Sequence, residues 1–482
     1  MTSAVQVAAT STVPTYCLVE AHARPTSDSD IKILVGLPTA GNWNGKFLQS
    51  GNGGFAGSVA PPTGSVQLGY VGAATDDGHT ASGFDASWAL GHPEKVVDFG
   101  YRALKETTDT AKALIAAFYG ASPRLSYFSG CSDGGREALQ EAQRYPGDWD
   151  GIVVGAPANF WTHHFTGFVF NQQVIANTPI SGAKLPAIQA AALAQCDESD
   201  GVVDGVVENP GSCRFDPGRM LCTGAENDSC LTQAQVSAVR AIMNGPHDPR
   251  TGGLIYPGYV FNAVNDPNFL GLGAWIFNGA PAFGLSTPVQ FVFGDQFFSY
   301  MVFGNPSWNF ATLNFMTDVD LADAKTAGIL NSTNRDLSAI ESRGAKMIMY
   351  HGWEDGAISP FNSINYYESV VATQGEAEGR AALQRTQDFF RLFMVPGMLH
   401  CGAGPGPNSF DTLTALANWV ERGQAPDRIV ATKYVNDNPA SGTVRTRPLC
   451  PFPQVAVYKG HGSTNVASNF DCRNPKAADH EN

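Results

Sequence analysis

RLSYFSGCSDGGREALQEAQRY, residues 124–145, opens as an apolar strand and closes as a helical pattern. Between the two, GCSDG at 130–134 matches the Gly-x-Ser-x-Gly pattern that places a nucleophilic serine. The flanking glycines let strand and helix meet at a sharp turn, which exposes the hydroxyl of Ser132 at the top of a sheet. The backbone N–H of Asp133, at the start of the helix, then faces a developing oxyanion. The alternative is a glycine-rich turn with an incidental serine.

Strand and helix patterns alternate on either side of this turn. Apolar strand patterns lie within 30–38, 46–54, 69–79, 149–158, 345–360 and 389–404. A helical pattern, with apolar residues three and four positions apart, covers 95–119. Strands that alternate with helices around a nucleophile turn predict a mostly parallel α/β sheet.

The middle of the chain differs from its flanks in composition and periodicity. Residues 159–340 hold four of the nine cysteines and many aromatic residues, with weak periodicity. They do not look like further βα units, and we interpret them as an inserted lid. The predicted fold is therefore an α/β-hydrolase fold with a large inserted lid domain, in which 1–158 and 341–482 form the catalytic domain.

Composition limits the partners of the chain. Of 482 residues, 43% are hydrophobic, which is enough for a sizeable core, and 52 glycines and 30 prolines indicate many loops. Lysine and arginine number 30 against 44 aspartates and glutamates, a net charge of −14, which argues against nucleic acid and anionic membranes as partners. The sequence has no run of about 18 apolar residues, so no transmembrane helix is predicted.

The cysteines indicate an oxidising compartment. Three pairs are close in sequence and lie in stretches rich in Gly, Pro and Asp: Cys196 with Cys213, Cys222 with Cys230, and Cys450 with Cys472. A cross-link stabilises such stretches, where local hydrogen bonding is sparse. Residues 1–16 lack a basic segment and a continuous apolar segment, so they are not an intact signal peptide. We expect a secreted protein, extracellular or periplasmic, whose signal peptide is absent from this sequence; scattered reduced cysteines are the alternative.

A nucleophilic serine needs a base and an acid, which α/β-hydrolases carry in the order serine, acid, histidine on loops after later strands. His400 follows the strand pattern RLFMVPGML and precedes a glycine-rich loop, and Asp355 follows MIMYHGW. His351 is the rival base, although it lies within a strand end and before the acid. Glu354 is the rival acid, and Asp355 is preferred because aspartate is the commoner partner. The tandem histidines at 163–164 fall in the lid, where packing or a surface role is the simpler interpretation.

A glycine loop, GNGGFAG at 51–57, has the glycine density of a phosphate-binding loop but lacks the lysine and the helix-opening pattern of such loops. In a hydrolase it better supplies a second oxyanion donor, from the N–H of Gly53 or Gly54. The residues do not decide between these two glycines. A plain turn is the alternative.

An acidic stretch within the lid, DESDGVVDGV at 197–206, has three aspartates at near-alternating spacing. Such carboxylates can converge in a tight loop, where backbone carbonyls complete an oxygen shell for Ca²⁺. The stretch is not an EF-hand, because position 6 counted from Asp197 is Val202 and not glycine. The alternative is a solvated acidic turn.

Two further cysteines flank the proposed catalytic residues. Cys131 precedes Ser132, and Cys401 follows His400. If both loops meet at one active site, these sulfurs are neighbours. A disulfide between them would limit drift of the Ser–His hydrogen bond, and small misplacements of catalytic groups lower rates strongly.

With these residues the sequence resembles the tannase and feruloyl esterase family of secreted α/β-hydrolases. The family hallmark, Cys-Ser…Asp…His-Cys, corresponds here to Cys131-Ser132, Asp355 and His400-Cys401. The resemblance covers nearly the whole chain. It includes the segments ARPTSDSDI, WNGKFLQSGNGGFAG, CDESDGVVDGVVENPGSCRFDP and HGWEDGAISP, together with the C-terminal cysteine pair.

The resemblance implies four disulfides and a structural calcium site. The implied bonds are Cys131–Cys401, Cys196–Cys213, Cys222–Cys230 and Cys450–Cys472, which leaves Cys17 without a partner in this sequence. The implied Ca²⁺ ligands are the side chains of Asp197, Asp200 and Asp204 and the carbonyls of Val202 and Val206. No organic cofactor is implied.

The expected function is that of a serine carboxylesterase acting on aromatic esters. Feruloyl or other hydroxycinnamoyl esters and galloyl esters rank first, free or attached to plant polysaccharide, because such phenolic esters dominate the family. Flat acids of this kind suit stacking against the aromatic residues of the lid. The alternatives are a terephthalate monoester hydrolase using the same site, a peptidase on the same fold, and a non-catalytic, calcium-dependent glycan-binding protein. A lid arginine would favour a substrate carboxylate; the candidates are Arg214, Arg219, Arg240, Arg250 and Arg335.

Overall fold

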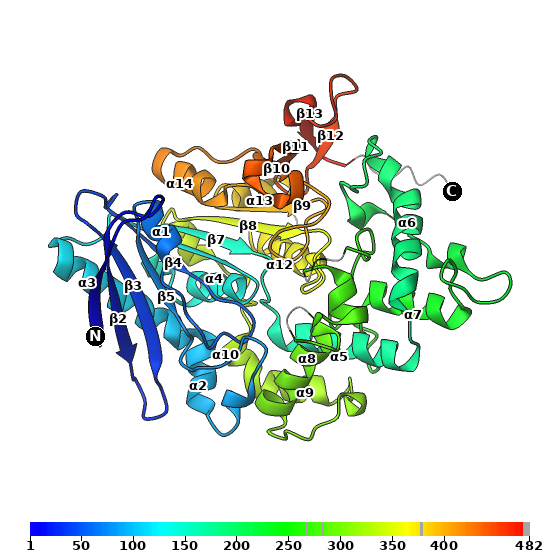
Figure 1. Ribbon diagram of the computed structural model, residues 1–482, viewed down its shortest axis with the longest axis horizontal. Helices are drawn as coiled ribbons and strands as arrows, with labels where there is room; N and C mark the ends of the chain where they lie inside the picture. The colour runs from blue at the N-terminus through cyan, green and yellow to red at the C-terminus, as the bar shows by residue number, and fades with distance from the viewer. Residues whose placement is uncertain (214, 267, 269, 282–283, 376–378, 476–482) are drawn as a thin grey trace. The chain divides into compact units, whose positions relative to one another are not determined.

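The computed structural model describes residues 1–213, 215–266, 268, 270–281, 284–375 and 379–475 (Figure 1). The chain divides into two compact units. The first holds 1–166, 292–347 and 368–389, and the second holds 167–291, 348–367 and 390–482. Much of the predicted lid therefore groups with the last strands and loops of the predicted catalytic domain. The lid boundaries at 159 and 340 stay a prediction.

Strands β1 to β7 of the first unit form a mixed sheet, in the order β1-β2-β3-β5-β4-β6-β7 (Figure 1). The pairs β1–β2, β2–β3 and β3–β5 are antiparallel, whereas β4–β5, β4–β6 and β6–β7 are parallel. The strands are β1 (Ser3–Val7), β2 (Tyr16–Ala23), β3 (Ile31–Pro38), β4 (Lys46–Ser50), β5 (Val71–Thr75), β6 (Leu125–Cys131) and β7 (Gly151–Gly155).

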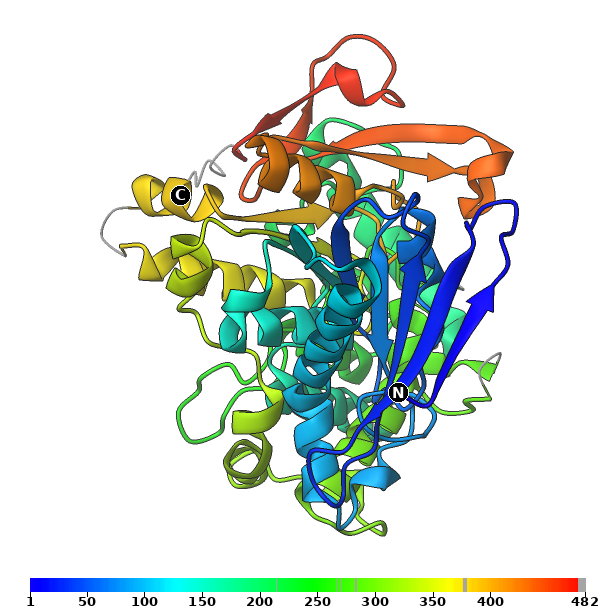
Figure 2. The ribbon, with the colours of Figure 1, turned by 90° about the vertical axis from the view of Figure 1, so that its left-hand side faces the viewer.

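Apolar composition explains the strands that the sequence predicts. β7, with the sequence GIVVG, is buried along its whole length, as expected of a strand inside a parallel sheet. At the N-terminal edge (blue in Figure 2), β1 and β2 extend the sheet with antiparallel pairs. Most of β1 is exposed, so no apolar run marks it in the sequence.

The predicted helix at 95–119 is confirmed with one irregularity. α2 (Pro93–Val97) passes through a π-helical turn at Asp98–Arg102 into α3 (Ala103–Tyr119). Gly120 ends the helix with a φ of +70°, the left-handed cap that glycine adopts without steric cost. Other helices are α5 (Trp161–Asn177), α8 (Val289–Gln296), α12 (Pro360–Thr373), α13 (Arg380–Gln387) and α14 (Thr412–Arg422).

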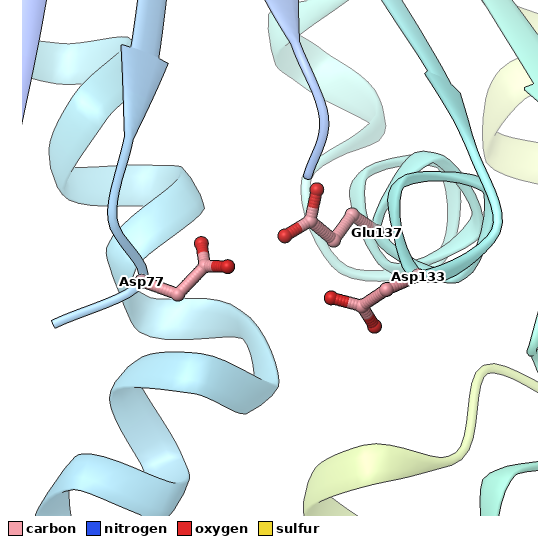
Figure 3. Close-up of side chains that lie close together, drawn as sticks. All are labelled: Asp77, Asp133 and Glu137. Atoms are coloured by element: carbon pink, nitrogen blue, oxygen red, sulfur yellow. The ribbon is translucent and has the colours of Figure 1, made fainter. Parts of the chain in front are cut away.

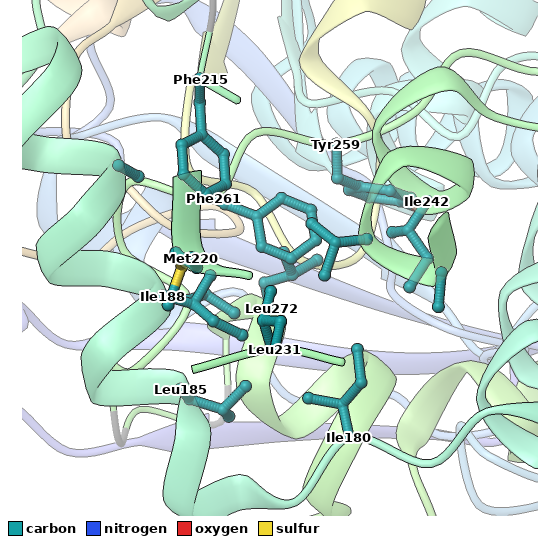
Figure 4. Packing of buried hydrophobic residues seen from close by; sticks show 14 of the residues in the cluster. Ile180, Leu185, Ile188, Phe215, Met220, Leu231, Ile242, Tyr259, Phe261 and Leu272 are labelled. Carbon is teal, nitrogen blue, oxygen red and sulfur yellow. The ribbon is translucent and has the colours of Figure 1, made fainter. Parts of the chain in front are cut away.

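The second unit has its own apolar core. Helices α6 (Leu185–Cys196) and α7 (Gln233–Asn244) enclose it, and α7 begins with a capping box formed by Thr232 and Gln235. The side chains labelled in Figure 4 include Leu185 and Ile188 of α6, Ile242 of α7, and Tyr259, Phe261 and Leu272. The predicted strands at 345–360 and 389–404 are β8 (Lys346–Gly352) and β9 (Phe390–Val395).

The C-terminal segment forms two antiparallel hairpins, orange and red in Figure 2. They consist of β10 (Ile429–Tyr434) with β11 (Thr443–Leu449) and of β12 (Val455–Tyr458) with β13 (Phe470–Arg473). Within the described ranges, no helix is both long and apolar enough to cross a membrane.

Candidate active site

Ser132 lies at a strained turn between β6 and α4 (Asp133–Arg144). Its φ is +69° and its ψ is −123°, a conformation that a residue other than glycine adopts only where its surroundings enforce it. The neighbouring glycines permit the close approach: a Cβ on Gly130 would lie 2.4 Å from the carbonyl oxygen of Gly134. This is the strand–turn–helix geometry of a nucleophile elbow.

Backbone hydrogen bonds fix this turn. The N–H of Ser132 donates to the carbonyl of Gly155 at the end of β7, over 3.1 Å, and Ala158 N–H donates to the carbonyl of Ser132, also over 3.1 Å. Arg136 N–H closes the first turn of α4 on the same carbonyl at 3.1 Å. Asp133 is the first residue of α4, so its N–H has no intrahelical acceptor. The predicted oxyanion donor is thus the helix's first N–H.

Asp355 and His400 meet in the second unit. His400 Nδ1 lies 2.7 Å from Asp355 Oδ2, and both side chains are buried. The other carboxylate oxygen, Oδ1, accepts the backbone N–H groups of Ala357 and Ile358, each at 2.8 Å. These bonds fix the carboxylate, so it holds the tautomer of His400 that carries its proton on Nδ1.

His351, the rival base, is buried against the same carboxylate. Its Nε2 lies 3.2 Å from Asp355 Oδ2 and 3.0 Å from the carbonyl of Ile358, while its Nδ1 lies 2.7 Å from Ser363 Oγ. Both ring nitrogens therefore have protein partners. Burial raises the pKa of Asp355, but electrostatic interaction with His400 and hydrogen bonds to both histidines outweigh burial and hold that pKa well below its usual value. Asp355 is therefore ionised at neutral pH.

Glu354, the rival acid, is bound elsewhere. Its Oε2 accepts the N–H of Ala263 at 3.2 Å, and burial raises the pKa of Glu354 to about 7. In the tandem histidines, His163 Nε2 lies 3.0 Å from Asp323 Oδ2, and its ring stacks on Phe160 with centroids 3.8 Å apart. These contacts agree with the packing role expected of that pair.

Of the two candidate oxyanion donors in the glycine loop after β4, only Gly54 occupies a position that requires glycine. Gly54 has a φ of +59°, and a Cβ there would lie 2.3 Å from the carbonyl oxygen of Gly83. A Cβ on Gly53 would meet nothing within 4 Å, and the Gly53 carbonyl accepts Ala56 N–H at 3.0 Å. Backbone conformation does not select between the two N–H groups, so the second oxyanion donor stays a prediction at either glycine.

Comparison with known proteins decides the family of this site. The sequence model of the family described as tannase and feruloyl esterase matches residues 17–473. The chain belongs to the tannase and feruloyl esterase family.

This family member is similar to known esterases over most of its length. It is 46% identical to an uncharacterised esterase of Xanthomonas campestris, over 95% of this chain and 84% of that protein. It is 34% identical to mono(2-hydroxyethyl) terephthalate hydrolase of Piscinibacter sakaiensis, over 97% and 86%. The crystal structure of feruloyl esterase B from Aspergillus oryzae has a TM-score of 0.86 at 27% identity, covering 98% of this chain and 96% of that one. The chain is a carboxylic ester hydrolase of α/β-hydrolase fold.

An aromatic residue of the predicted lid packs against the esterase's histidine. The ring of Trp275 meets the ring of His400 edge-on, with centroids 5.8 Å apart. The same segment of chain is attached to the acid loop, because the Tyr259 hydroxyl donates to the carbonyl of Ala357 at 2.9 Å. The sequence marks this segment as aromatic but does not single out Trp275.

Three predicted disulfides of the esterase are confirmed: Cys196–Cys213, Cys222–Cys230 and Cys450–Cys472. Cys17 is a free, half-buried thiol. Cys131 and Cys401 are each disulfide-bonded, and Cys401 Sγ lies 3.7 Å from His400 Nε2. The pairing of these two cysteines with each other stays a prediction.

The acidic loop at 197–206 contains one feature that fits a cation. Asp197 Oδ1 is buried and has no hydrogen-bond partner among the described residues, while its Oδ2 accepts Gly205 N–H at 3.0 Å. Both oxygens of Asp200 accept backbone N–H groups, at 2.9 and 3.0 Å. A buried carboxylate oxygen without a donor is costly unless a cation or a proton meets it. Oxygen donors of this kind are the ligands that Ca²⁺ prefers.

Asp204, the third aspartate of the loop, already faces positive charge. Its Oδ2 lies 2.7 Å from Arg445 and 2.5 Å from Arg447, both on β11. Across the described part of the chain, the one group of three acids that can each bring one carboxylate oxygen within 4.8 Å of the others is a second cluster, not this loop. The calcium site stays a proposal, supported by the Asp197 oxygen.

A second acidic cluster, formed by Asp77, Asp133 and Glu137, was not predicted from the sequence. The carboxyl groups of Asp77, Asp133 and Glu137 are buried and point toward one another (Figure 3). Asp133 and Glu137 are four positions apart and lie on one face of α4, a spacing that the sequence does contain. Asp77 comes from the turn after β5, and no local pattern predicts its approach.

Two of the candidate lid arginines are engaged in local ion pairs. Arg240 lies 2.7 Å from Asp216, and Arg250 lies 2.9 Å from Asp248. Arg214 falls outside the described residues. A role for any lid arginine in binding a substrate carboxylate stays a prediction.

Proposed function

We propose that this esterase is a serine esterase in which Ser132 is the nucleophile, His400 the general base and Asp355 the residue that orients the base. The observation that carries the proposal is the buried hydrogen bond between His400 Nδ1 and Asp355 Oδ2, 2.7 Å long. The φ of +69° at Ser132, typical of a nucleophile elbow, supports it. The chain order serine, aspartate, histidine, which is that of α/β-hydrolases, supports it as well.

Hydrolysis then runs in two steps through an acyl-enzyme. His400 Nε2 takes the hydroxyl proton of Ser132 as the oxygen attacks the ester carbonyl, and gives it to the departing alcohol. The N–H groups of Asp133 and of Gly53 or Gly54 hold the tetrahedral oxyanion. Water, deprotonated by His400, attacks the acyl-enzyme; the bond from the acyl carbon to Ser132 Oγ breaks, His400 returns the proton to that oxygen, and the acid leaves. These steps need no organic cofactor.

The acyl group is that of an aromatic acid. Trp275, 5.8 Å from His400 between ring centroids, supports this class of substrate. Hydroxycinnamoyl esters such as feruloyl esters and galloyl esters rank first, free or attached to plant polysaccharide. A terephthalate monoester is the second candidate, because a relative that is 34% identical over 97% of this chain is named mono(2-hydroxyethyl) terephthalate hydrolase.

Three properties accompany this function. A Cys131–Cys401 disulfide ties the serine turn to the histidine loop, and the disulfide-bonded state of both cysteines supports it. A structural Ca²⁺ ion would neutralise the acidic loop; its ligands would be the side chains of Asp197, Asp200 and Asp204 and the carbonyls of Val202 and Val206. Secretion, to the exterior or the periplasm, is supported by three further disulfides.

The test is a comparison of kcat/KM for methyl ferulate, methyl gallate and mono(2-hydroxyethyl) terephthalate, with Ser132→Ala as the control. We expect hydrolysis of at least one ester well above background, and loss of it in Ser132→Ala. Failure on all three esters, with peptide cleavage in their place, would identify a peptidase. Undiminished biological effect of Ser132→Ala would support the non-catalytic, glycan-binding alternative.

A further inference from the structure

Asn52 joins the glycine loop to the helix that follows Ser132. Its carbonyl accepts Gly134 N–H at 2.9 Å, and its own N–H donates to Glu137 Oε2 at 2.8 Å. Its side-chain amide donates to Asp77 Oδ1 at 2.8 Å and to Glu137 Oε1 at 3.3 Å. One residue, next to Gly53, is therefore bonded both to α4 and to the turn after β5.

The contact between loop and helix leaves no space for adjustment. A Cβ on Gly51 would lie 2.7 Å from the Cα of Gly134 and 2.8 Å from Glu137 Oε2. Gly51 N–H donates to the carbonyl of Ser129 on β6 at 2.9 Å. Any change in the position of Glu137 is thus transmitted directly to the loop.

The carboxyl groups that receive Asn52 are buried and crowded. Asp77, Asp133 and Glu137 converge on the same region (Figure 3), and Arg136 Nε lies 2.5 Å from Asp133 Oδ1. Arg136 therefore supplies one positive charge to three acids. Burial, together with the charge of Asp133, raises the pKa of Glu137 to about 7, so protons supply part of the remaining neutralisation. The acids can then remain together in the interior as acceptors for Asn52.

We propose that Asp77 and Glu137 are positioning residues for ester hydrolysis: acting through Asn52, they hold the loop at 51–54 where its N–H stabilises the oxyanion. The inference rests on the proposed function, because it takes Gly53 or Gly54 as an oxyanion donor. Neither carboxyl group touches the substrate. An oxyanion donor contributes roughly 10²–10³ in kcat, and a displaced donor forfeits part of that.

The variant Glu137→Gln tests this arrangement. Glutamine offers one acceptor oxygen where glutamate offers two, so one of the two bonds from Asn52 is lost. We expect kcat on p-nitrophenyl acetate to fall about 10- to 100-fold, with KM within about threefold. Asn52→Ala, at a half-buried position, should reproduce this loss. Thermal melting of each variant establishes that it is folded.

Glu141→Gln is the matched control. Glu141 lies one turn further along α4, is fully buried like Glu137, and accepts a hydrogen bond from Trp149 Nε1 at 2.7 Å instead of contacting the loop. We expect its kcat to stay within about twofold of the unaltered protein.

A second readout separates positioning from a general loss of structure. Trifluoroacetophenone, which forms a tetrahedral oxyanion adduct with a reactive serine, should bind Glu137→Gln about 10- to 100-fold more weakly, while benzoate binds within about threefold. Equal loss of both affinities, or a kcat that matches Glu141→Gln, overturns the inference. Ser132→Ala is measured alongside. Turnover retained in Ser132→Ala overturns the proposed function and this inference together, whereas an inactive Ser132→Ala with an unaffected Glu137→Gln overturns the inference alone.

Discussion

Replacing Asp355 by asparagine removes the charge that faces His400 and keeps the shape of the side chain. Asp355 Oδ1 accepts two backbone N–H groups, from Ala357 and Ile358, each at 2.8 Å. The asparagine oxygen takes that position, because an NH₂ group there would face two donors. The NH₂ group is then directed at His400 Nδ1, which lies 2.7 Å from Oδ2 in the unaltered protein.

That arrangement reverses the tautomer of the histidine. Nδ1 must accept from the amide, so the proton moves to Nε2, where the reaction needs a base. The imidazolium formed during catalysis also loses its counter-charge. The corresponding change in the serine protease triad lowers kcat by about 10⁴. We expect kcat here to fall about 10³- to 10⁴-fold, which corresponds to about 4–5.5 kcal/mol.

Initial rates with p-nitrophenyl acetate at neutral pH measure the effect, and thermal unfolding verifies that the variant is folded. Glu354→Gln is the control, because Glu354 is a buried neighbour that binds Ala263 N–H and not His400. Its kcat should remain within about threefold. A kcat for Asp355→Asn within tenfold of the unaltered protein would refute the reasoning. A large loss in Glu354→Gln in its place would transfer the acid's role to that residue.

Three further predictions concern the disulfide, the calcium loop and a buried acid. The double variant Cys131→Ser/Cys401→Ser should lower kcat at least about tenfold while the melting temperature falls by only a few degrees; unchanged kcat, with loss of the bond shown by mass spectrometry, contradicts the tethering. Chelation by EDTA should lower the melting temperature of the unaltered protein by about 5 °C and that of Asp197→Asn by much less, and equal shifts contradict the calcium proposal. Burial raises the pKa of Glu141 from 4.5 to about 8, so its contribution to stability is complete below the unfolded pKa and is lost as pH rises through the folded one. Glu141→Gln should therefore flatten the decline in unfolding free energy between about pH 5 and pH 8, and parallel curves for the two proteins would contradict this.

Local signals explain what the sequence could predict. The turn at Ser132 is flanked by an apolar strand, two glycines and a helical pattern, and each of these depends only on adjacent residues. The proposed roles of Asp355 and His400 were predictable from chain order, because each residue follows a buried strand. From the sequence, Asp355 is preferred over Glu354 because aspartate is the commoner partner of a catalytic histidine. The contacts of Asp355 support this preference: its Oδ2 lies 2.7 Å from His400 Nδ1, while its Oδ1 accepts two backbone N–H groups.

The remaining features depend on contacts between distant residues. Asn52 forms hydrogen bonds with Asp77 and Glu137, which are 25 and 85 positions away. No local sequence pattern around any of the three residues predicts these contacts. Strand β1 is mostly exposed and β11 has the polar sequence TVRTRPL, so neither carries the apolar run that marks a buried strand. Edge and hairpin strands of this kind are defined by their partners.

The ion pairs between Asp204 and β11 determine how early the acidic loop can fold during translation. Arg445 and Arg447 follow Asp204 by 241 and 243 positions. At translation rates of about 5–20 residues per second, roughly 10 to 50 s pass between the synthesis of Asp204 and that of its two arginine partners. A similar interval separates Glu208 from Ala456, 248 positions later, whose N–H donates to the Glu208 carboxylate. The loop therefore cannot form all of its native contacts until nearly the whole chain has been synthesised. Its folding is completed late in, or after, translation.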